Sequence, residues 1–170
     1  MLASIQGQVN RLVDLANALL DLEELRGAGP LGREEVFVPE LVHEAVRSAA
    51  PRDTRVVVDA PDALAHVNRR WTELAVANLV GNALRLGGGE VRVEAHVDAG
   101  GLTVAVCDDG PGFTDDFRPQ AFDRFSRAEQ SRSTPGSGLG LALVRAVAEA
   151  HGGRAYLGEG PGTRVVVEMP

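Results

Sequence analysis

The sequence predicts a mixed α/β domain preceded by one helix, and three observations indicate this class. Four segments place apolar residues three or four positions apart, which is the spacing of a helix with one buried face. Shorter segments between them alternate apolar and polar residues, which is typical of strands. With 170 residues, of which 44% are apolar, the chain is long enough for one hydrophobic core and too short for two ordinary domains.

The first helix is expected at residues 2–25, where an apolar stripe recurs at Ile5, Val9, Leu12, Ala16 and Leu19. Such a stripe packs either on the chain's own core or on another helix in a coiled coil, and the segment is too short to decide between them. Gly27, Gly29, Pro30 and Gly32 then break the helix. We therefore expect residues 1–30 to form a helix with its linker, and residues 31–170 to form the domain.

The domain is expected to begin with helices and strands in alternation. Pro39 suits the first turn of a helix, and a β-branched run and a strongly periodic segment follow it. Glycines at positions 87–89 end that periodic segment, and the sequence at 98–101 suits the turn of a hairpin. In chain order we expect a helix at 39–50, strands at 54–60 and 63–67, a helix at 69–86, and a hairpin of strands 90–97 and 102–107.

Residues 110–138 predict a long loop because they are rich in glycine, proline and charge and lack a regular apolar period. Long loops inside small domains commonly serve a function. After this loop we expect a helix at 138–151, a stop at Gly152-Gly153, and strands at 155–158 and 163–169.

The composition excludes several classes of function. The formal net charge of −7 repels a phosphate backbone, and no run of Lys and Arg offsets it, so nucleic acid is not an expected partner. The single cysteine, Cys107, cannot form an intrachain disulfide. No apolar stretch reaches the roughly 20 residues that a membrane helix needs. We therefore expect a soluble, cytoplasmic chain that makes no membrane contact of its own.

Two asparagines are the first candidate for a binding site. Asn78 and Asn82 are four residues apart on a predicted helix, so their side chains share one face. An amide oxygen there suits Mg²⁺, which takes its remaining ligands from water and from nucleotide phosphates. Taken alone, two exposed helix-surface asparagines are the commoner explanation.

A second candidate is the sequence Asp108-Asp109-Gly110-Pro111-Gly112, directly after a predicted strand. Its glycines let a ligand approach the main chain. The Asp108 carboxylate can accept a hydrogen bond from an exocyclic amine, which distinguishes adenine from guanine. Taken alone, the segment fits a plain turn at least as well.

A third candidate is Gly136-Ser137-Gly138-Leu139-Gly140, which opens a predicted helix. The free N–H groups and the positive dipole end of a helix N-terminus favour phosphate. The segment is not a P-loop because it lacks the Gly-Lys-Ser/Thr ending of that motif.

In order and spacing, these three segments resemble the N, G1 and G2 boxes of histidine-kinase ATP-binding domains, and residues 121–127 look like that family's F box. The resemblance covers about residues 36–170. It implies a two-layer α/β sandwich with a mixed, mainly antiparallel sheet and three helices on one face. The N-terminal helix looks like the end of the second helix of the dimerisation domain, which packs in a four-helix bundle in such kinases.

The resemblance also implies the role of each candidate residue. Asn82 would coordinate Mg²⁺ with support from Asn78, and Asp108 would hold the adenine amine. Gly110 and Gly112 would give the base room, and Phe122 and Phe125 would hinge a lid. The phosphates would meet the backbone of Gly136, Ser137, Gly138, Leu139 and Gly140, and Arg85 and Arg127 would steady the γ-phosphate unless they are solvated surface arginines.

The implied activity is transfer of the ATP γ-phosphate to a histidine of the dimerisation domain, for relay to a response regulator. Related ATP hydrolases and anti-sigma serine kinases usually carry Glu where this chain has Asn78, so histidine phosphotransfer is favoured. No segment resembles the phosphoacceptor box, because the four histidines, His43, His66, His96 and His151, stand in unrelated contexts. We therefore expect a fragment of a kinase whose full-length relatives are commonly membrane-anchored homodimers.

One departure from the family's pattern bears on affinity. Leu86 leads straight into three glycines, where the family often has several loop residues. A shortened loop would expose more of the nucleotide, which leaves weak ATP binding or degenerate activity as a hypothesis. A nucleotide-free interaction module that binds a partner kinase or a response regulator is the alternative from another class of function.

Overall fold

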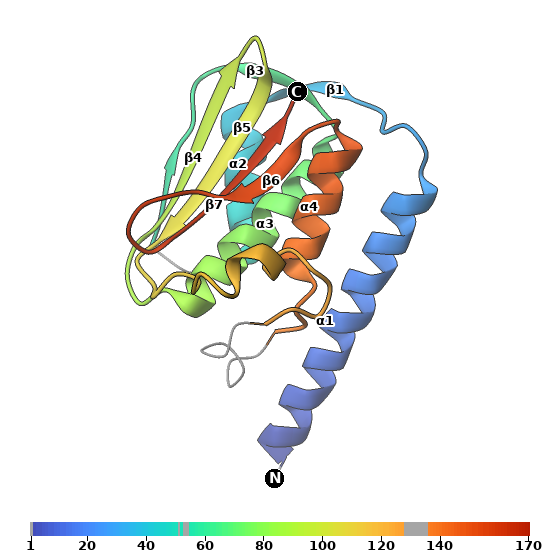
Figure 1. The fold of residues 1–170 in the computed structure, drawn as a ribbon. Coiled ribbons are helices and arrows are strands. Elements are labelled where there is room, and N and C mark those ends of the chain that lie inside the picture. Colours follow the sequence, from blue (N-terminus) through green and yellow to red (C-terminus); the bar gives the residue numbers. More distant parts are fainter. Residues whose placement is uncertain (1, 51, 53–54, 128–135) are drawn as a thin grey trace.

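The computed structural model describes residues 2–50, 52, 55–127 and 136–170, and it confirms the predicted two-layer sandwich (Figure 1). One layer is a five-stranded sheet in the order β2-β4-β5-β7-β6. Only β2 and β4 pair in parallel, so the sheet is mainly antiparallel. The strands are β2 Val56–Asp59, β4 Val91–Asp98, β5 Gly101–Asp108, β6 Arg154–Leu157 and β7 Thr163–Met169.

Three helices cover one face of this sheet: α2 Val38–Ala49, α3 Arg69–Leu86 and α4 Gly140–Ala150. Pro39 lies in the first turn of α2, as the sequence predicts. Asn68 caps α3, because its side chain accepts a hydrogen bond from the Trp71 N–H at 3.1 Å. The last helix begins at Gly140 rather than at 138, so Gly136 and Gly138 belong to the loop before it.

Two elements were missed by sequence reasoning. Strand β1, Glu34–Phe37, pairs antiparallel with β3, Leu64–Val67, in a separate two-stranded sheet. Only Val36 of β1 is buried, so the segment carries no alternation long enough to indicate a strand. A short 3-10 helix, Arg118–Gln120, also interrupts the predicted loop.

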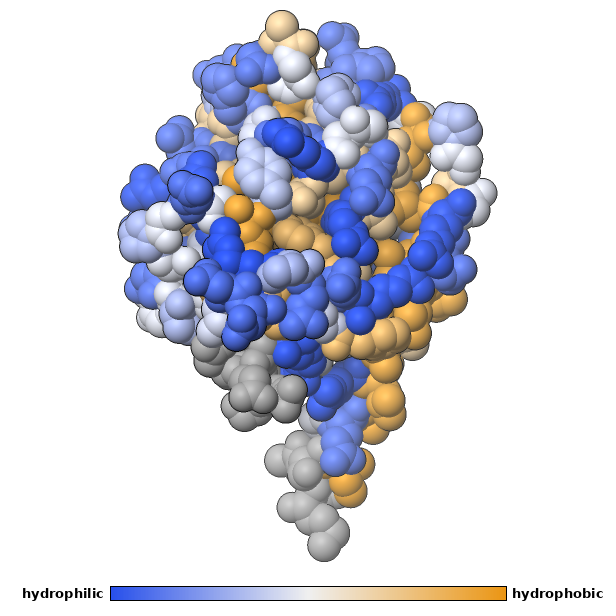
Figure 2. Space-filling model, in the orientation of Figure 1, coloured by the Kyte–Doolittle hydropathy of each residue, from blue (hydrophilic) through white to orange (hydrophobic). Residues whose placement is uncertain are grey.

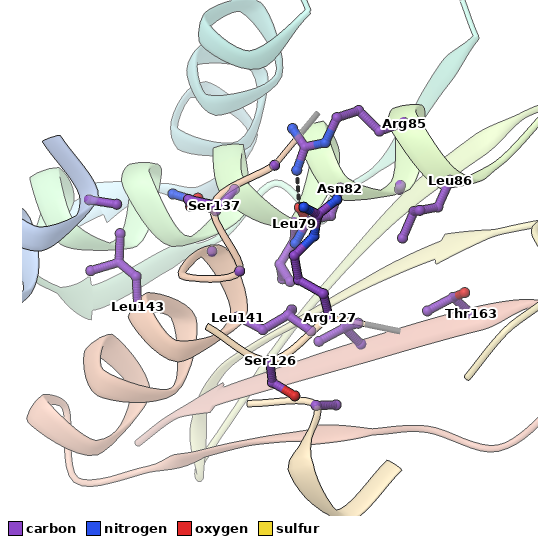
Figure 3. Close-up of a pocket in the computed structure, with 18 of the residues that line it drawn as sticks. Leu79, Asn82, Arg85, Leu86, Ser126, Arg127, Ser137, Leu141, Leu143 and Thr163 are labelled. Carbon is purple, nitrogen blue, oxygen red and sulfur yellow. Dashed lines mark hydrogen bonds between the residues drawn. The ribbon is translucent and has the colours of Figure 1, made fainter. Parts of the chain in front are cut away.

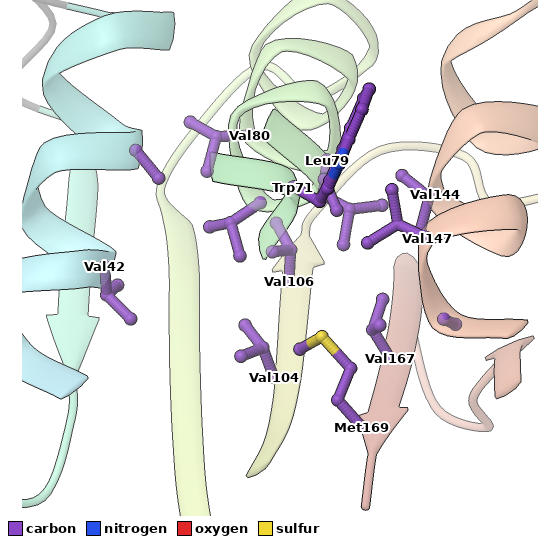
Figure 4. Close-up of a cluster of buried hydrophobic side chains, with 14 of the residues drawn as sticks. Val42, Trp71, Leu79, Val80, Val104, Val106, Val144, Val147, Val167 and Met169 are labelled. Atoms are coloured by element: carbon purple, nitrogen blue, oxygen red, sulfur yellow. The ribbon is translucent and has the colours of Figure 1, made fainter. Parts of the chain in front are cut away.

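Alternation along β5 builds the core and positions one polar group. Leu102, Val104 and Val106 point inward and are at most 2% exposed. They pack with residues of α3, α4 and β7 (Figure 4). Because side chains on one face of a strand repeat every second residue, Asp108 is the next inward position, at the end of the strand. The sheet therefore delivers this carboxylate to the inner face, beyond the apolar core.

A buried histidine joins the two helices that flank the core. His151 is fully buried; its Nε2 accepts a hydrogen bond from the Asn68 N–H at 3.0 Å, and its Nδ1 lies 2.8 Å from the Val147 carbonyl oxygen. Burial lowers the pKa of His151, and the neutral ring satisfies both contacts. The start of α3 is thereby tied to the end of α4.

Helix α1, Leu2–Gly27, runs beside α4 (Figure 1). Its buried anchors are Leu22 and Leu25, which lie on a different face from the predicted stripe. In that stripe Leu19 packs against the core, whereas Ile5, Val9 and Leu12 are 48 to 64% exposed, so only the C-terminal end of the stripe docks on the chain's own core. Within the described residues, no helix is both long and apolar enough to cross a membrane.

Candidate functional site

A cavity of about 380 Å³ lies where α3, the start of α4 and the ends of β5 and β7 meet (Figure 3). This volume falls within the usual range for small-molecule sites. Most of the residues singled out from the sequence line it, although they come from segments far apart in the chain. They are Asn78, Asn82, Arg85, Asp108, Arg127, Gly136, Ser137, Gly138 and Gly140.

One end of the cavity holds a buried carboxylate. Asp108 is 8% exposed, and its Oδ1 accepts a hydrogen bond from the Gly110 N–H at 2.8 Å. Burial raises the pKa of Asp108, and hydrogen bonds from Gly110 and Thr163 oppose that rise. Asp108 therefore presents a fixed, shielded acceptor to whatever enters this end.

The other end holds the asparagines and an arginine. The Asn78 amide donates to the Leu74 carbonyl oxygen at 2.9 Å, which fixes its rotamer. Arg85 donates a hydrogen bond to the Asn82 Oδ1, and Figure 3 shows this contact. The shared helical face predicted for the two asparagines is confirmed, and a cationic group lies directly beside them.

Apolar side chains separate the two polar ends. Val106 and Val165 contribute from the sheet, and Leu141 and Leu143 contribute from α4. Such walls accept a flat, weakly polar ring, while the few polar groups fix its orientation. The cavity is therefore suited to a ligand with an aromatic part at one end and anionic groups at the other.

The loop before α4 is shaped by its glycines. Gly138 has a φ of +73°, and a Cβ there would lie 3.0 Å from backbone atoms of Phe125. The Phe125 N–H also donates to the Gly138 carbonyl oxygen at 2.9 Å. At Gly140 a Cβ would lie 3.2 Å from the Asn78 Oδ1. Glycine therefore lets the start of α4 approach both the loop and the asparagines.

Comparison with known proteins identifies the family. The pattern of the histidine kinase-, DNA gyrase B- and HSP90-like ATPases matches residues 67–170, which is more than half of the chain. The chain belongs to this family. The match contains the asparagine pair, the Asp108 segment and the glycine segment, so all three lie in the family's ATPase domain.

Curated relatives narrow the relationship to sensor histidine kinases. A probable sensor histidine kinase HK of Mycobacterium tuberculosis is 35% identical over 99% of this chain and 46% of its own length. The sensor histidine kinase component HK1 of the same species is 37% identical over 78% of this chain and 81% of its own length. The chain thus spans about half the length of the first of these relatives.

Among solved structures, the ATP binding domain of PrrB from Mycobacterium tuberculosis is 30% identical to this chain, with a TM-score of 0.64 over 81% of this chain and 96% of that one. The mycobacterial sensor histidine kinase MprB is 28% identical, with a TM-score of 0.70 over 81% of this chain and 97% of that one. This chain accordingly corresponds to the ATP-binding catalytic domain of sensor histidine kinases.

Five residues predicted to bind the nucleotide lie outside the cavity lining, among the described positions: Gly110, Gly112, Phe122, Phe125 and Leu139. Gly110 still donates to Asp108. Leu139 is fully buried in the core at the N-cap of α4. In the segment that resembles the family's F box, Phe122 packs on the buried Phe117 and Ala121, whereas Phe125 is 58% exposed. A hinge role for these two aromatic residues stays a prediction.

Sequence reasoning missed several lining residues. Thr163 pairs with Asp108 in the β5–β7 register and hydrogen-bonds its carboxylate, which only the strand pairing reveals. Gly162, which precedes Thr163 and lies outside the cavity lining, has a φ of +75° and lies against the Asp108 carbonyl. Helix α1 adds Asp14, Asn17 and Asp21, whose spacings of three and four could have indicated a second, polar face.

The glycines that follow α3, at positions 87–89, are held in place by hydrogen bonds from two of them to Asp109. The Asp109 Oδ1 accepts hydrogen bonds from the Gly88 N–H at 3.2 Å and the Gly89 N–H at 3.0 Å. The segment is thus held against the turn that follows Asp108. Asp109 therefore positions the glycines at 88 and 89, a role that the sequence motif does not reveal.

Proposed function

We propose that this chain binds Mg²⁺-ATP and transfers the γ-phosphate to a histidine of a dimerisation domain, for relay to a response regulator. One observation carries the proposal: a buried carboxylate and a cation-lined, glycine-rich end face each other across an apolar cavity. Its relatives are sensor histidine kinases, which supports the same activity. A nucleotide-free interaction module would not need this arrangement of polar ends.

At the Asp108 end, the carboxylate would accept a hydrogen bond from the exocyclic amine of adenine. Guanine presents a carbonyl oxygen at that position, so two acceptors would face each other and the buried carboxylate would lose its partner. The hydrogen bonds from Gly110 and Thr163 hold Asp108 in place before the base arrives. This preorganisation favours adenine without a rearrangement of the site.

At the other end, the start of α4 offers backbone N–H groups, and Arg85 and Arg127 add positive charge. The Asn82 Oδ1 would coordinate Mg²⁺, with Asn78 supporting its waters. Among the described residues, no group of three or more His, Cys, Asp and Glu is placed to hold a metal, so the ion would depend on Asn82 and the phosphates. When bound, Mg²⁺ neutralises charge on the transferred phosphoryl group.

On helix α3, neither Asn78 nor its nearest acidic neighbour is placed to activate water. Asn78 cannot take a proton, and the nearby Glu73 lies outside the cavity lining and pairs with Arg69 at 3.2 Å. Phosphoryl transfer depends mainly on positioning and charge neutralisation, and an acceptor imidazole supplies its own lone pair. Transfer to histidine is therefore favoured over hydrolysis.

The outward face of α1 supports a dimeric full-length protein. Ile5, Val9, Leu12, Val13 and Leu20 are all exposed by 48% or more. Figure 2 shows the apolar residues gathered along this helix. On the proposed function, the dimerisation bundle would cover this face and bring the phosphoacceptor with it, and the whole kinase would be membrane-anchored.

The test is calorimetric titration of Mg²⁺-ATP and Mg²⁺-GTP into the wild-type chain and into Asp108→Asn. We expect binding of ATP but not of GTP, and a loss of about 100-fold in ATP affinity for Asp108→Asn, since a buried hydrogen bond to a charged acceptor is removed. Equal affinity for the two nucleotides, or unchanged ATP binding by Asp108→Asn, would contradict the proposal.

A further inference from the structure

One wall of the cavity comes from outside the ATPase domain. Asp14, Asn17 and Asp21 of α1 line the same cavity as Asn82 and Arg85. Figure 3 shows α1 entering on the side of Ser137 and Leu143, away from Thr163. This wall therefore faces the end that the proposed function assigns to the phosphates rather than the end that it assigns to adenine.

Several contacts hold α1 in this position. Leu22 and Leu25 are buried in the core, at 2% and 6% exposure. Glu24 makes a two-point ion pair with Arg70, in which one of the two bonds is 2.9 Å long. Glu23 also lies 3.8 Å from Arg124. The acidic edge of α1 is therefore placed at the cavity by packing and charge.

The charges on this wall oppose a phosphate chain. Burial lowers the pKa of Arg85 and the nearby Arg127 lowers it further, whereas the Asp14 carboxylate opposes this shift and favours the charged arginine. Asp14 thus offsets positive charge that a phosphate group would otherwise meet. A triphosphate in the cavity would also lie near two carboxylates of its own sign.

We propose that Asp14 and Asp21 are affinity-determining residues that lower the affinity of the cavity for nucleotide phosphates while α1 is docked. The inference rests on the proposed function, because it places the phosphates at the Arg85 end. Coupling between two binding events is reciprocal, so a nucleotide that binds also weakens the docking of α1. Movement of the helix would then raise the affinity of the site for ATP.

The test measures ATP, ADP and adenosine affinities by calorimetry for the wild-type chain, Asp14→Asn, Asp21→Asn and the double variant. We expect ATP to bind about fivefold more tightly for each carboxylate removed, the size of a partly exposed charge interaction. ADP should gain less, and adenosine should gain nothing because it carries no phosphate. The gain should shrink at about 1 M salt, where screening is strong.

The control variant Asp62→Asn removes the same charge from an exposed turn outside the cavity, and it should leave every affinity unchanged. Unchanged or weaker ATP binding by the double variant would overturn the inference, as would an equal gain for adenosine.

Asp108→Asn separates the failure of this inference from the failure of the proposed function. If it loses ATP while the double variant matches the wild type, only the role of α1 fails. If the wild type binds no nucleotide, the proposed function fails as well.

Discussion

Replacing His151 tests how the helices that carry the site are held together. In His151→Ala the Asn68 N–H loses its acceptor, and the Val147 carbonyl loses the contact with Nδ1. Both groups lie at ends of helices, because Asn68 caps α3 and His151 itself caps α4. The substitution thus loosens the junction between the helix with the asparagines and the helix that follows the glycine segment.

The magnitude follows from the environment of the ring. An unsatisfied buried N–H costs about 1–3 kcal/mol, and the cavity left by a fully buried side chain costs about 2 kcal/mol more. We therefore expect His151→Ala to lower the free energy of unfolding by about 3–5 kcal/mol, against a total of about 5–15 kcal/mol for a typical domain. His66 is exposed, so His66→Ala should change the free energy of unfolding by less than about 0.5 kcal/mol.

Urea unfolding followed by the fluorescence of Trp71 measures this directly, because Trp71 is the chain's single tryptophan and is 4% exposed. Burial lowers the pKa of His151 in the folded state, so the unfolded chain binds this proton more readily. The stability from the neutral ring is then complete above about pH 6.5 and is lost as the pH falls below it. The difference between wild type and His151→Ala should narrow on acidification.

Two results would refute this reasoning. A loss below about 1 kcal/mol for His151→Ala at pH 7.5 would mean that the two contacts do not tie the helices together. A wild-type advantage that stays constant between pH 7.5 and pH 5.5 would mean that the folded and unfolded chains bind the His151 proton equally, so that burial does not lower the pKa of this ring.

Three further predictions concern the site. Gly162→Ala introduces a Cβ at a φ of +75° against the Asp108 carbonyl, so thermal unfolding should reveal a loss of about 1–3 kcal/mol, and an unchanged midpoint would argue against the strain. Burial raises the pKa of Asp108 in the folded state, so the wild-type chain loses stability as the pH rises through that pKa and the buried carboxyl becomes charged. Asn carries no charge, so at pH 7.5 and without added nucleotide Asp108→Asn should have a melting temperature no lower than that of the wild type. Asp109→Ala removes the acceptor of two amides, and hydrogen exchange at Gly88 and Gly89 should quicken about tenfold, whereas equal rates would remove its positioning role.

The elements that the sequence predicts are those whose apolar residues recur with a regular helical or strand period. The inward alternation of Leu102, Val104 and Val106 and the helical period of α3 both follow from one buried face per element. Strand β1 escaped prediction because Val36 alone is buried in it, and its pairing with β3 depends on a distant segment. The apolar stripe of α1 left two partners open, and in the structure its last member, Leu19, packs on the chain's own core while Ile5, Val9 and Leu12 stay exposed.

The sequence predicts those site residues that belong to a recognisable local motif. Asn78, Asn82, Asp108 and the glycine segment lie in three recognisable segments, and the fold brings them to one cavity. Thr163 and Asp14 carry no motif of their own. Thr163 enters through the pairing of β7 with β5, and Asp14 enters through the docking of α1, which lies outside the residues that match the family. Both depend on tertiary contacts, which the periodicity of a single segment does not encode.

The hydrogen bond between Arg85 and Asn82 competes with the contacts that both residues would make to Mg²⁺-ATP, and this lowers the affinity for the nucleotide. Arg85 donates a hydrogen bond to the Asn82 Oδ1, which is the oxygen that the proposed function assigns to Mg²⁺. A cation at that oxygen would repel the guanidinium, so metal binding and this hydrogen bond oppose each other. Arg85 would then move to a phosphate, where a charge-assisted bond replaces the one that it gives up. Because Arg85 and Asn82 give up this hydrogen bond when they bind the phosphates and Mg²⁺, only the difference between the two sets of bonds contributes to affinity, so ATP binding by this chain should be moderate rather than tight.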